Sequence, residues 1–85
     1  MQTKRNERLA AASDVAGEIV QEYLRARAKH PTGMHSPHEG YGVLLEEVDE
    51  LWDEVKRREV DPAAMRKEAI QVAAMALAFV LEAIP

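Results

Sequence analysis

Residues 40–54 constrain the fold of this chain most strongly, because their apolar side chains recur with the period of an α-helix. When these residues are placed about 100° apart, apolar side chains form one stripe and carboxylates form a second stripe beside it. This pattern predicts an amphipathic helix whose apolar stripe packs in a core. The stripe contains Leu44, Val48, Leu51 and Val55, and it is widened by Tyr41, Leu45 and Trp52.

The preceding part of the chain predicts a first helix over residues 7–29. Apolar side chains recur there at three- and four-residue steps, and cations crowd the C-terminal end, where they suit the negative pole of a helix. Pro31 and Gly33 end this helix. Residues 1–6 are expected to fray.

Two short motifs mark the starts of further helices. The run SPHE, beginning at Ser36, has the form of a capping box and predicts a helix over residues 37–58. The pair Asp61-Pro62 starts a third helix that runs nearly to Pro85. No convincing strand pattern is present.

Gly40 and Gly42 lie within the first two turns of the second predicted helix. Each costs about 1 kcal/mol relative to alanine in a helix interior. They indicate either close approach of another backbone or ligand, or tight helix packing, and we favour packing.

Residues 69–81 are apolar except for Gln71. This run is too short to span a bilayer, so we expect a buried helix and no membrane partner. Two neighbouring helices in an 85-residue chain are not expected to cover it. The predicted fold is therefore one all-α domain over residues 1–85, a three-helix chain whose bundle is completed by oligomerisation as a homodimer or homotetramer. In the simplest arrangement the third helices meet across a two-fold axis.

Composition narrows the environment and the partners. The chain has no cysteine, which fits a reducing cytoplasm, and its N-terminus lacks the apolar run of a signal peptide. The formal charge of −4 argues against a nucleic-acid partner. Acid is concentrated, since seven Asp or Glu and no Lys or Arg fall within residues 39–54.

The carboxylates of the second and third predicted helices are candidates for a metal site. Glu47 and Glu50 lie on the acidic stripe, with Glu46 just beyond it, and Glu68 lies one turn before Gln71. Like charges so spaced destabilise a helix by about 0.2–0.5 kcal/mol per pair, which favours a cationic ligand. If the two helices pack antiparallel, Glu68 faces Glu47 and Glu50, and these oxygens with the Gln71 amide suit magnesium. The alternative is a solvated acidic face.

The run Glu46-Glu47-Val48-Asp49-Glu50 resembles the EExxE motif of the MazG-like superfamily of all-α nucleoside triphosphate pyrophosphohydrolases. The run Glu68-Ala69-Ile70-Gln71 stands where that family has ExxD, and the similarity spans residues 36–82. The resemblance implies an oligomeric enzyme that hydrolyses a nucleoside triphosphate to a monophosphate and pyrophosphate. It further implies that Glu47, Glu50, Glu68 and the residue at position 71 bind Mg²⁺ or Mn²⁺. Glu46 and Glu47 would be catalytic, with Glu46 a ligand or a residue that orients water.

The sequence departs from the family pattern at Gln71, where the family has aspartate. Glutamine still offers a carbonyl oxygen, but it brings no negative charge and cannot act as a base. On the same helix no other acid lies at this height, because Asp61 comes too early and Glu82 too late. We expect weaker magnesium binding, and hydrolysis that is weakened or lost.

Several side chains near the acidic run are candidates for substrate binding. Lys56, Arg66 and Lys67 flank it and are candidates for holding distal phosphates, although we favour the interpretation that they are ordinary solvated helix ends. His38, in the first turn of the second helix, is a candidate for contacting a nucleotide. Two aromatic residues of the apolar stripe could stack on a base, but core packing is the better interpretation. The three histidines lack the helical spacing of a zinc site, and loop polarity accounts for them better.

A second functional class stays open beside the enzyme. The chain would then be a non-catalytic helical oligomer that acts as a nucleotide-binding or protein-interaction module, with its acidic face as a docking surface. Gln71 and the small size of the chain favour this alternative.

Overall fold

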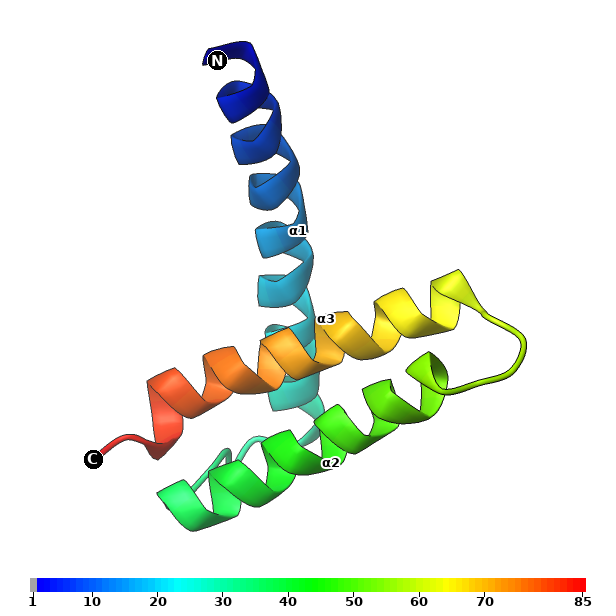
Figure 1. The fold of residues 1–85 in the computed structure, drawn as a ribbon. Coiled ribbons are helices and arrows are strands. Elements are labelled where there is room, and N and C mark those ends of the chain that lie inside the picture. Colours follow the sequence, from blue (N-terminus) through cyan, green and yellow to red (C-terminus); the bar gives the residue numbers. More distant parts are fainter. Residues whose placement is uncertain (1) are drawn as a thin grey trace.

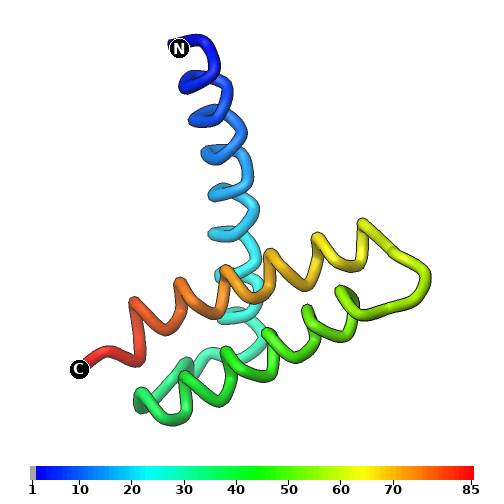
Figure 2. The backbone as a smooth tube through the Cα atoms, in the orientation of Figure 1, coloured from blue at the N-terminus to red at the C-terminus, as the bar shows by residue number. Residues whose placement is uncertain are grey.

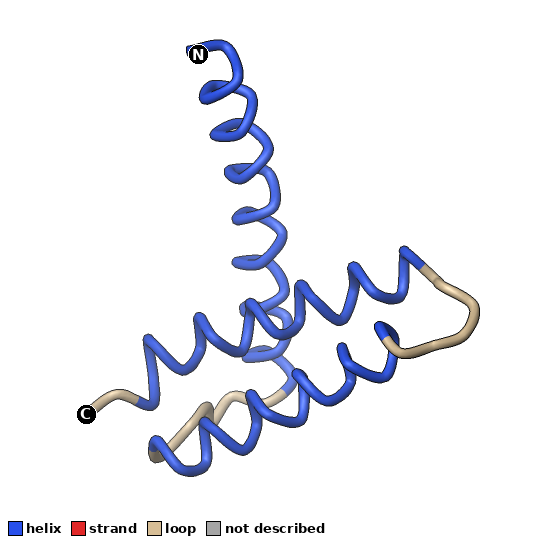
Figure 3. Tube along the Cα trace, in the orientation of Figure 1, coloured by secondary structure: helices blue, strands red, loops and turns tan. Residues whose placement is uncertain are grey.

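A computed structural model describes residues 2–85, and all regular structure in this range is helical. Helix α1 spans Gln2–Lys29, α2 spans Pro37–Val55 and α3 spans Pro62–Ala78, and a short π-helix, η1 at Phe79–Ala83, continues α3 (Figures 1 and 3). The predicted all-α class with three helices is confirmed for these residues. Within them, no helix is both long and apolar enough to cross a membrane.

The predicted starts of α2 and α3 are confirmed by their capping hydrogen bonds. Ser36 Oγ accepts a bond from the Glu39 N–H at 3.1 Å, and Asp61 Oδ1 accepts one from the Ala64 N–H at 3.1 Å. Each bond satisfies an N–H group that the helix itself leaves free. In a capping box the glutamate side chain also accepts a bond from the N–H of the N-cap residue, here Ser36. In this structure Glu39 Oε2 accepts instead from the N–H of the preceding residue, His35, at 3.4 Å.

The predicted end of α1 at Lys29 is confirmed, but two other helix boundaries differ from prediction. α1 begins at Gln2, so residues 2–6 are helical where we expected fraying, and Met1 lies outside the described residues. α2 ends at Val55 and not at residue 58. Residues 56–59 are all charged, so they offer no apolar side chain to extend the packing of α2 against α3.

α2 and α3 form an antiparallel hairpin, which α1 crosses with its C-terminal half (Figures 1 and 2). Within residues 2–85, α1 contacts α3 and not α2, whereas α2 contacts both α3 and η1. The N-terminal half of α1 extends away from the hairpin (Figure 2). The chain is correspondingly elongated, with extents of 43 × 34 × 21 Å along its principal axes.

The core is small and lies around the second half of α3. Gly40 is buried beside it, and a Cβ atom added there would lie 2.9 Å from side-chain atoms of both Phe79 and Ala83. Tight packing therefore accounts for Gly40, as we favoured, whereas the corresponding position at Gly42 has no described atom within 4 Å. The buried hydrophobic residues are Met34, Ala74, Met75, Ala78 and Ala83.

Two aromatic residues of the apolar stripe are not in this core. Tyr41 is 62% exposed and Trp52 is 57% exposed, so the prediction that they pack in the core of the chain is wrong. α3 covers the inner edge of the stripe, where Leu44 and Leu51 are half-buried. Helical periodicity groups apolar residues on one face, but it does not state how wide a face the neighbouring helix covers.

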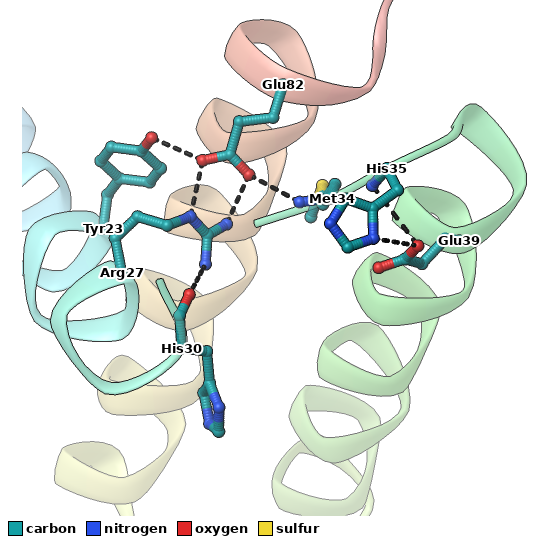
Figure 4. Close-up of polar contacts among 7 residues, drawn as sticks. All are labelled: Tyr23, Arg27, His30, Met34, His35, Glu39 and Glu82. Atoms are coloured by element: carbon teal, nitrogen blue, oxygen red, sulfur yellow. Dashed lines mark hydrogen bonds and ion pairs between the residues drawn. The ribbon is translucent and has the colours of Figure 1, made fainter. Parts of the chain in front are cut away.

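Glu82 connects the C-terminal end of the chain to α1 and to the α1–α2 loop (Figure 4). Its carboxylate accepts bonds from the Tyr23 hydroxyl at 2.6 Å, from the Arg27 guanidinium at 2.5 and 2.7 Å, and from the Met34 N–H at 3.1 Å. Arg27 also donates to the His30 carbonyl at 3.1 Å. The hydrogen bonds from Arg27 are the main reason that the pKa of Glu82 is lowered to about 2, and those from Tyr23 and Met34 add to them. Burial acts in the opposite direction and raises this pKa. Glu82 thus fixes where α1 crosses the hairpin.

Candidate metal centre

The antiparallel packing of α2 against α3 brings three carboxylates together. Glu47 and Glu50 lie one turn apart on α2, and Glu68 lies on α3. One carboxylate oxygen from each lies within 4.8 Å of the other two. In residues 2–85 no other group of three acidic, histidine or cysteine side chains comes as close. We call these residues the carboxylate trio; their juxtaposition is the one expected from the sequence.

Burial, together with crowding within the carboxylate trio, raises the pKa of two of its members. Burial, followed by repulsion from Glu50, Glu68 and Glu46, raises the pKa of Glu47 to about 7. Burial and repulsion from Glu50 also raise the pKa of Glu68, and the charge of Lys67 partly opposes this rise. Both shifts have the sign expected when carboxylates face one another without a sufficient cation. A divalent cation among these oxygens would reverse both shifts.

Gln71 lies beside the carboxylate trio and bridges two of its members. When its amide is oriented so that both ends have partners, Nε2 donates to Glu47 Oε2 at 3.1 Å and to Glu68 Oε2 at 3.2 Å. An amide nitrogen cannot be a metal ligand here, so ligation by Gln71 requires the opposite orientation, with the carbonyl oxygen toward the carboxylates. The structure therefore places Gln71 at the predicted site, as a hydrogen-bond donor.

A fourth acid approaches Gln71 from α1. Glu22 accepts two bonds from the Arg25 guanidinium, at 2.8 and 2.5 Å, and Arg25 is the main reason that the pKa of Glu22 is lowered. Glu22 and Gln71 line the same groove beside α1. We expected an acid at the height of Gln71 only on the third helix and so missed Glu22, because only the crossing of α1 over α3 brings that residue near.

Glu46 is exposed and lies outside the carboxylate trio. Its charge nevertheless contributes to the raised pKa of its neighbour Glu47. Its predicted role, as a ligand or as a residue that orients water, stays a prediction.

Two of the predicted phosphate-binding cations are engaged elsewhere. The Arg66 guanidinium donates to both carboxylate oxygens of Glu18 at 2.7 and 2.6 Å, and so connects α3 to α1. Lys56 Nζ lies 3.3 Å from Asp53 Oδ1 at the end of α2. The structure thus gives both residues a partner within the protein.

The other two predicted substrate-binding residues have different surroundings. Lys67 is near enough to the carboxylate trio for its charge to counteract the raised pKa of Glu68. His38 is exposed in the first turn of α2. It does not line the groove between α1 and α2 that Glu47 and Gln71 line.

This groove, of about 470 Å³, runs between α1 and α2. Glu47 and Gln71 line it, and so do Arg25 and Lys29 at the end of α1 and His30 directly after the helix. From the sequence we interpreted these cations only as favourable to the negative pole of the helix, and we did not predict that they line a groove. Only the crossing position of α1, set in part by Glu82, directs this end of the helix toward the acids.

Comparisons of the chain with protein-family models, with curated proteins and with solved structures each found no match. The resemblance to the MazG-like superfamily therefore rests on the two sequence motifs and stays a prediction.

Proposed function

We propose that this chain is a magnesium-dependent nucleoside triphosphate pyrophosphohydrolase of the MazG-like kind. The observation that carries the proposal is the carboxylate trio, whose oxygens come from two helices and lie within 4.8 Å of one another. The resemblance of residues 46–50 and 68–71 to the two family motifs supports the choice of substrate. The products would be a nucleoside monophosphate and pyrophosphate.

The donor set fits a magnesium ion. Glu47, Glu50 and Glu68 offer only oxygen atoms, which Mg²⁺ prefers, and the exposure of Glu50 leaves room for the waters that this ion keeps. Burial, and after it repulsion from the neighbouring carboxylates, raises the pKa of Glu47, and a cation bound there would offset the repulsion. When bound, the ion would neutralise phosphate charge and lower the pKa of a coordinated water.

The residues around the carboxylate trio have complementary tasks in this proposal. The Gln71 amide keeps Glu47 and Glu68 aligned by donating to both. Glu46, exposed beside them, takes a proton from the water whose oxygen attacks the α-phosphorus. As the new bond between the water oxygen and the α-phosphorus forms, the bond from the α-phosphorus to the oxygen that bridges it to the β-phosphorus breaks, and pyrophosphate leaves. Lys29 lies along the groove, where its charge can attract the pyrophosphate.

Pyrophosphate release from a panel of ordinary and damaged nucleoside triphosphates, with Mg²⁺ or Mn²⁺, tests the proposal. Glu47→Gln is expected to lower release by about 100-fold or more, because it removes a ligand and a charge at the reacting centre. Gln71→Asp is expected to raise release, because it adds a fourth carboxylate. Glu59→Gln is the matched control, since Glu59 is an exposed acid in the α2–α3 loop.

Two outcomes would remove the proposal. One is the absence of both pyrophosphate release and metal-dependent nucleotide binding in the native chain. The other is release that Glu47→Gln and Glu59→Gln leave equally unchanged.

A non-catalytic nucleotide-binding or protein-interaction module is the second candidate function. The bridging orientation of Gln71 and the exposed apolar side chains of α2 favour it. Thermal melting with and without millimolar Mg²⁺ tells a cation site from a purely structural acidic face, because a ligand that binds only the folded state raises the melting temperature. We propose both functions for a homodimer or homotetramer.

A further inference from the structure

The side of α2 that faces away from α3 carries a row of exposed apolar residues. Their steps alternate between four and three residues, which is the spacing of a seam along which two helices pack. Each is between 40% and 62% exposed. We call this row the outer stripe, and it consists of Tyr41, Leu45, Val48, Trp52 and Val55.

The chain exposes much more surface than a compact monomer of its mass. Its accessible surface is 6477 Å², whereas a folded monomer of 9.5 kDa exposes about 5,000 Å². Its radius of gyration is 14.7 Å, whereas a compact domain of 85 residues has about 12 Å. The excess of about 1,400 Å² is in the range that each subunit buries in a permanent homodimer, about 1,000 Å² or more.

The first half of α1 is a second uncovered part of the chain. α1 contains no buried residue among those described, and Leu9 is 65% exposed on the part that extends from the hairpin (Figure 1). An isolated helix of about 12–15 residues is only marginally stable in water. This segment therefore needs a surface to pack on, and the chain provides none within residues 2–85.

Charge favours packing of the two uncovered parts on each other. The first turns of α1 carry three cations, Lys4, Arg5 and Arg8, against a single acid. The exposed acids of α2 flank the outer stripe, Asp49 and Asp53 among them. One chain cannot join its own α1 to its own α2 because α1 crosses α3 instead, so the matching surface belongs to another copy.

We infer that this protein forms a two-fold homodimer in which the first half of α1 of each copy packs along the outer stripe of the other. The same contact is then made twice, as two-fold symmetry requires. This interface differs from the one predicted from the sequence, in which the third helices meet across the two-fold axis. The reason is that α1 and α2 of the same chain already cover the buried face of α3. The inference does not depend on the proposed hydrolysis.

Trp52 provides a direct readout, because it is the only tryptophan in the chain and lies in the outer stripe. At micromolar concentration we expect a dimer mass by analytical ultracentrifugation. On dilution we expect the emission of Trp52 to shift to the red as its indole meets water. The melting temperature should rise with protein concentration, as it does when folding is coupled to association.

Substitutions test both sides of the contact. Val48→Glu and Leu9→Glu are each expected to weaken dimerisation by at least 100-fold. Val60→Glu places the same charge at a residue of the α2–α3 loop that is 65% exposed, and it should leave the dimer intact. If Leu9→Glu left a native-like dimer while Val48→Glu dissociated it, the proposed pairing of α1 with α2 would be wrong.

The native chain alone can also overturn the inference, so the test holds even where the Glu variants unfold. A monomer mass at tens of micromolar, with a melting temperature independent of concentration, would contradict it. So would a dimer that Val48→Glu and Val60→Glu affect equally.

Discussion

Glu47 links the stability of this protein to its proposed chemistry. Burial and three neighbouring carboxylates raise its pKa to about 7, so near neutral pH the side chain is divided between its protonated and ionised forms. The protonated form relieves repulsion but leaves one fewer charge for a cation. The Gln71 amide donates to Glu47 and to Glu68 and so provides a neutral hydrogen-bond donor between them.

Without divalent cations, folding stability should fall as pH rises from about 5 to 8. The folded pKa of Glu47 lies above the ordinary value, so its stabilising contribution is full below pH 4.5 and is lost as pH passes about 7. We expect a loss of roughly 1–2 kcal/mol, discounted for partial exposure. Urea denaturation at both pH values measures it, and Glu47→Gln should remove most of the loss. An equal loss in Glu47→Gln and in the control Glu59→Gln would contradict this assignment.

Glu82 should respond to pH in the opposite direction. Its folded pKa of about 2 lies below the ordinary value, so its contribution is present above pH 4.5 and is lost as pH falls toward 2. Glu82→Gln is expected to destabilise the chain at pH 7 by about 1.5–3 kcal/mol, the range for hydrogen bonds to charged groups. Denaturation by urea measures the change, with Glu59→Gln as control. A change of a few tenths of a kcal/mol would show that the network is unimportant for stability.

At the scale of helices, the sequence predicts capped starts better than it predicts which neighbours a helix packs against. Ser36 and Asp61 begin α2 and α3 as expected, because capping depends on residues close in sequence. The exposure of Trp52 and the partners of Glu82 were not predictable in this way. Both depend on how helices cross, which local periodicity does not specify. The approach of Glu22 to Gln71 has the same origin.

The two glycines of α2 provide a matched pair for testing helix packing. Gly40→Ala should destabilise the chain by about 1–3 kcal/mol, because its Cβ would meet Ala83 and Phe79 at 2.9 Å. Gly42→Ala should stabilise it by about 0.5–1 kcal/mol, because its Cβ meets no described atom within 4 Å and alanine favours the helix. Thermal or urea denaturation measures both. Changes of the same sign would contradict the packing described around Gly40.

At the scale of the whole molecule, the opposite pH responses of Glu47 and Glu82 set a stability maximum. Glu82 destabilises the chain as it is protonated below pH 4.5, and Glu47 destabilises it as it ionises toward pH 7. The maximum is therefore expected near pH 5 in the absence of a divalent cation. The sequence could not predict it, because neither pKa is perturbed until the helices meet.

Millimolar Mg²⁺ should move this stability maximum toward neutral pH. A cation held by ionised carboxylates favours the charged form of Glu47 and so removes the loss of stability at higher pH. Melting temperatures measured across pH 4–8, with Mg²⁺ or with a chelator, check this expectation. A profile that Mg²⁺ leaves unchanged would mean that the acidic face is purely structural.

The central claim is that Glu47, Glu50 and Glu68 form one cation site across two helices. Titration with Mn²⁺, followed by the loss of the free-ion electron paramagnetic resonance signal, tests this claim most directly. We expect a Mn²⁺ site in the native chain that Glu68→Gln on α3 weakens by about 10- to 100-fold, as Glu50→Gln on α2 does, while Glu59→Gln leaves it unchanged. Binding by the native chain that is no tighter than binding by Glu68→Gln would contradict it.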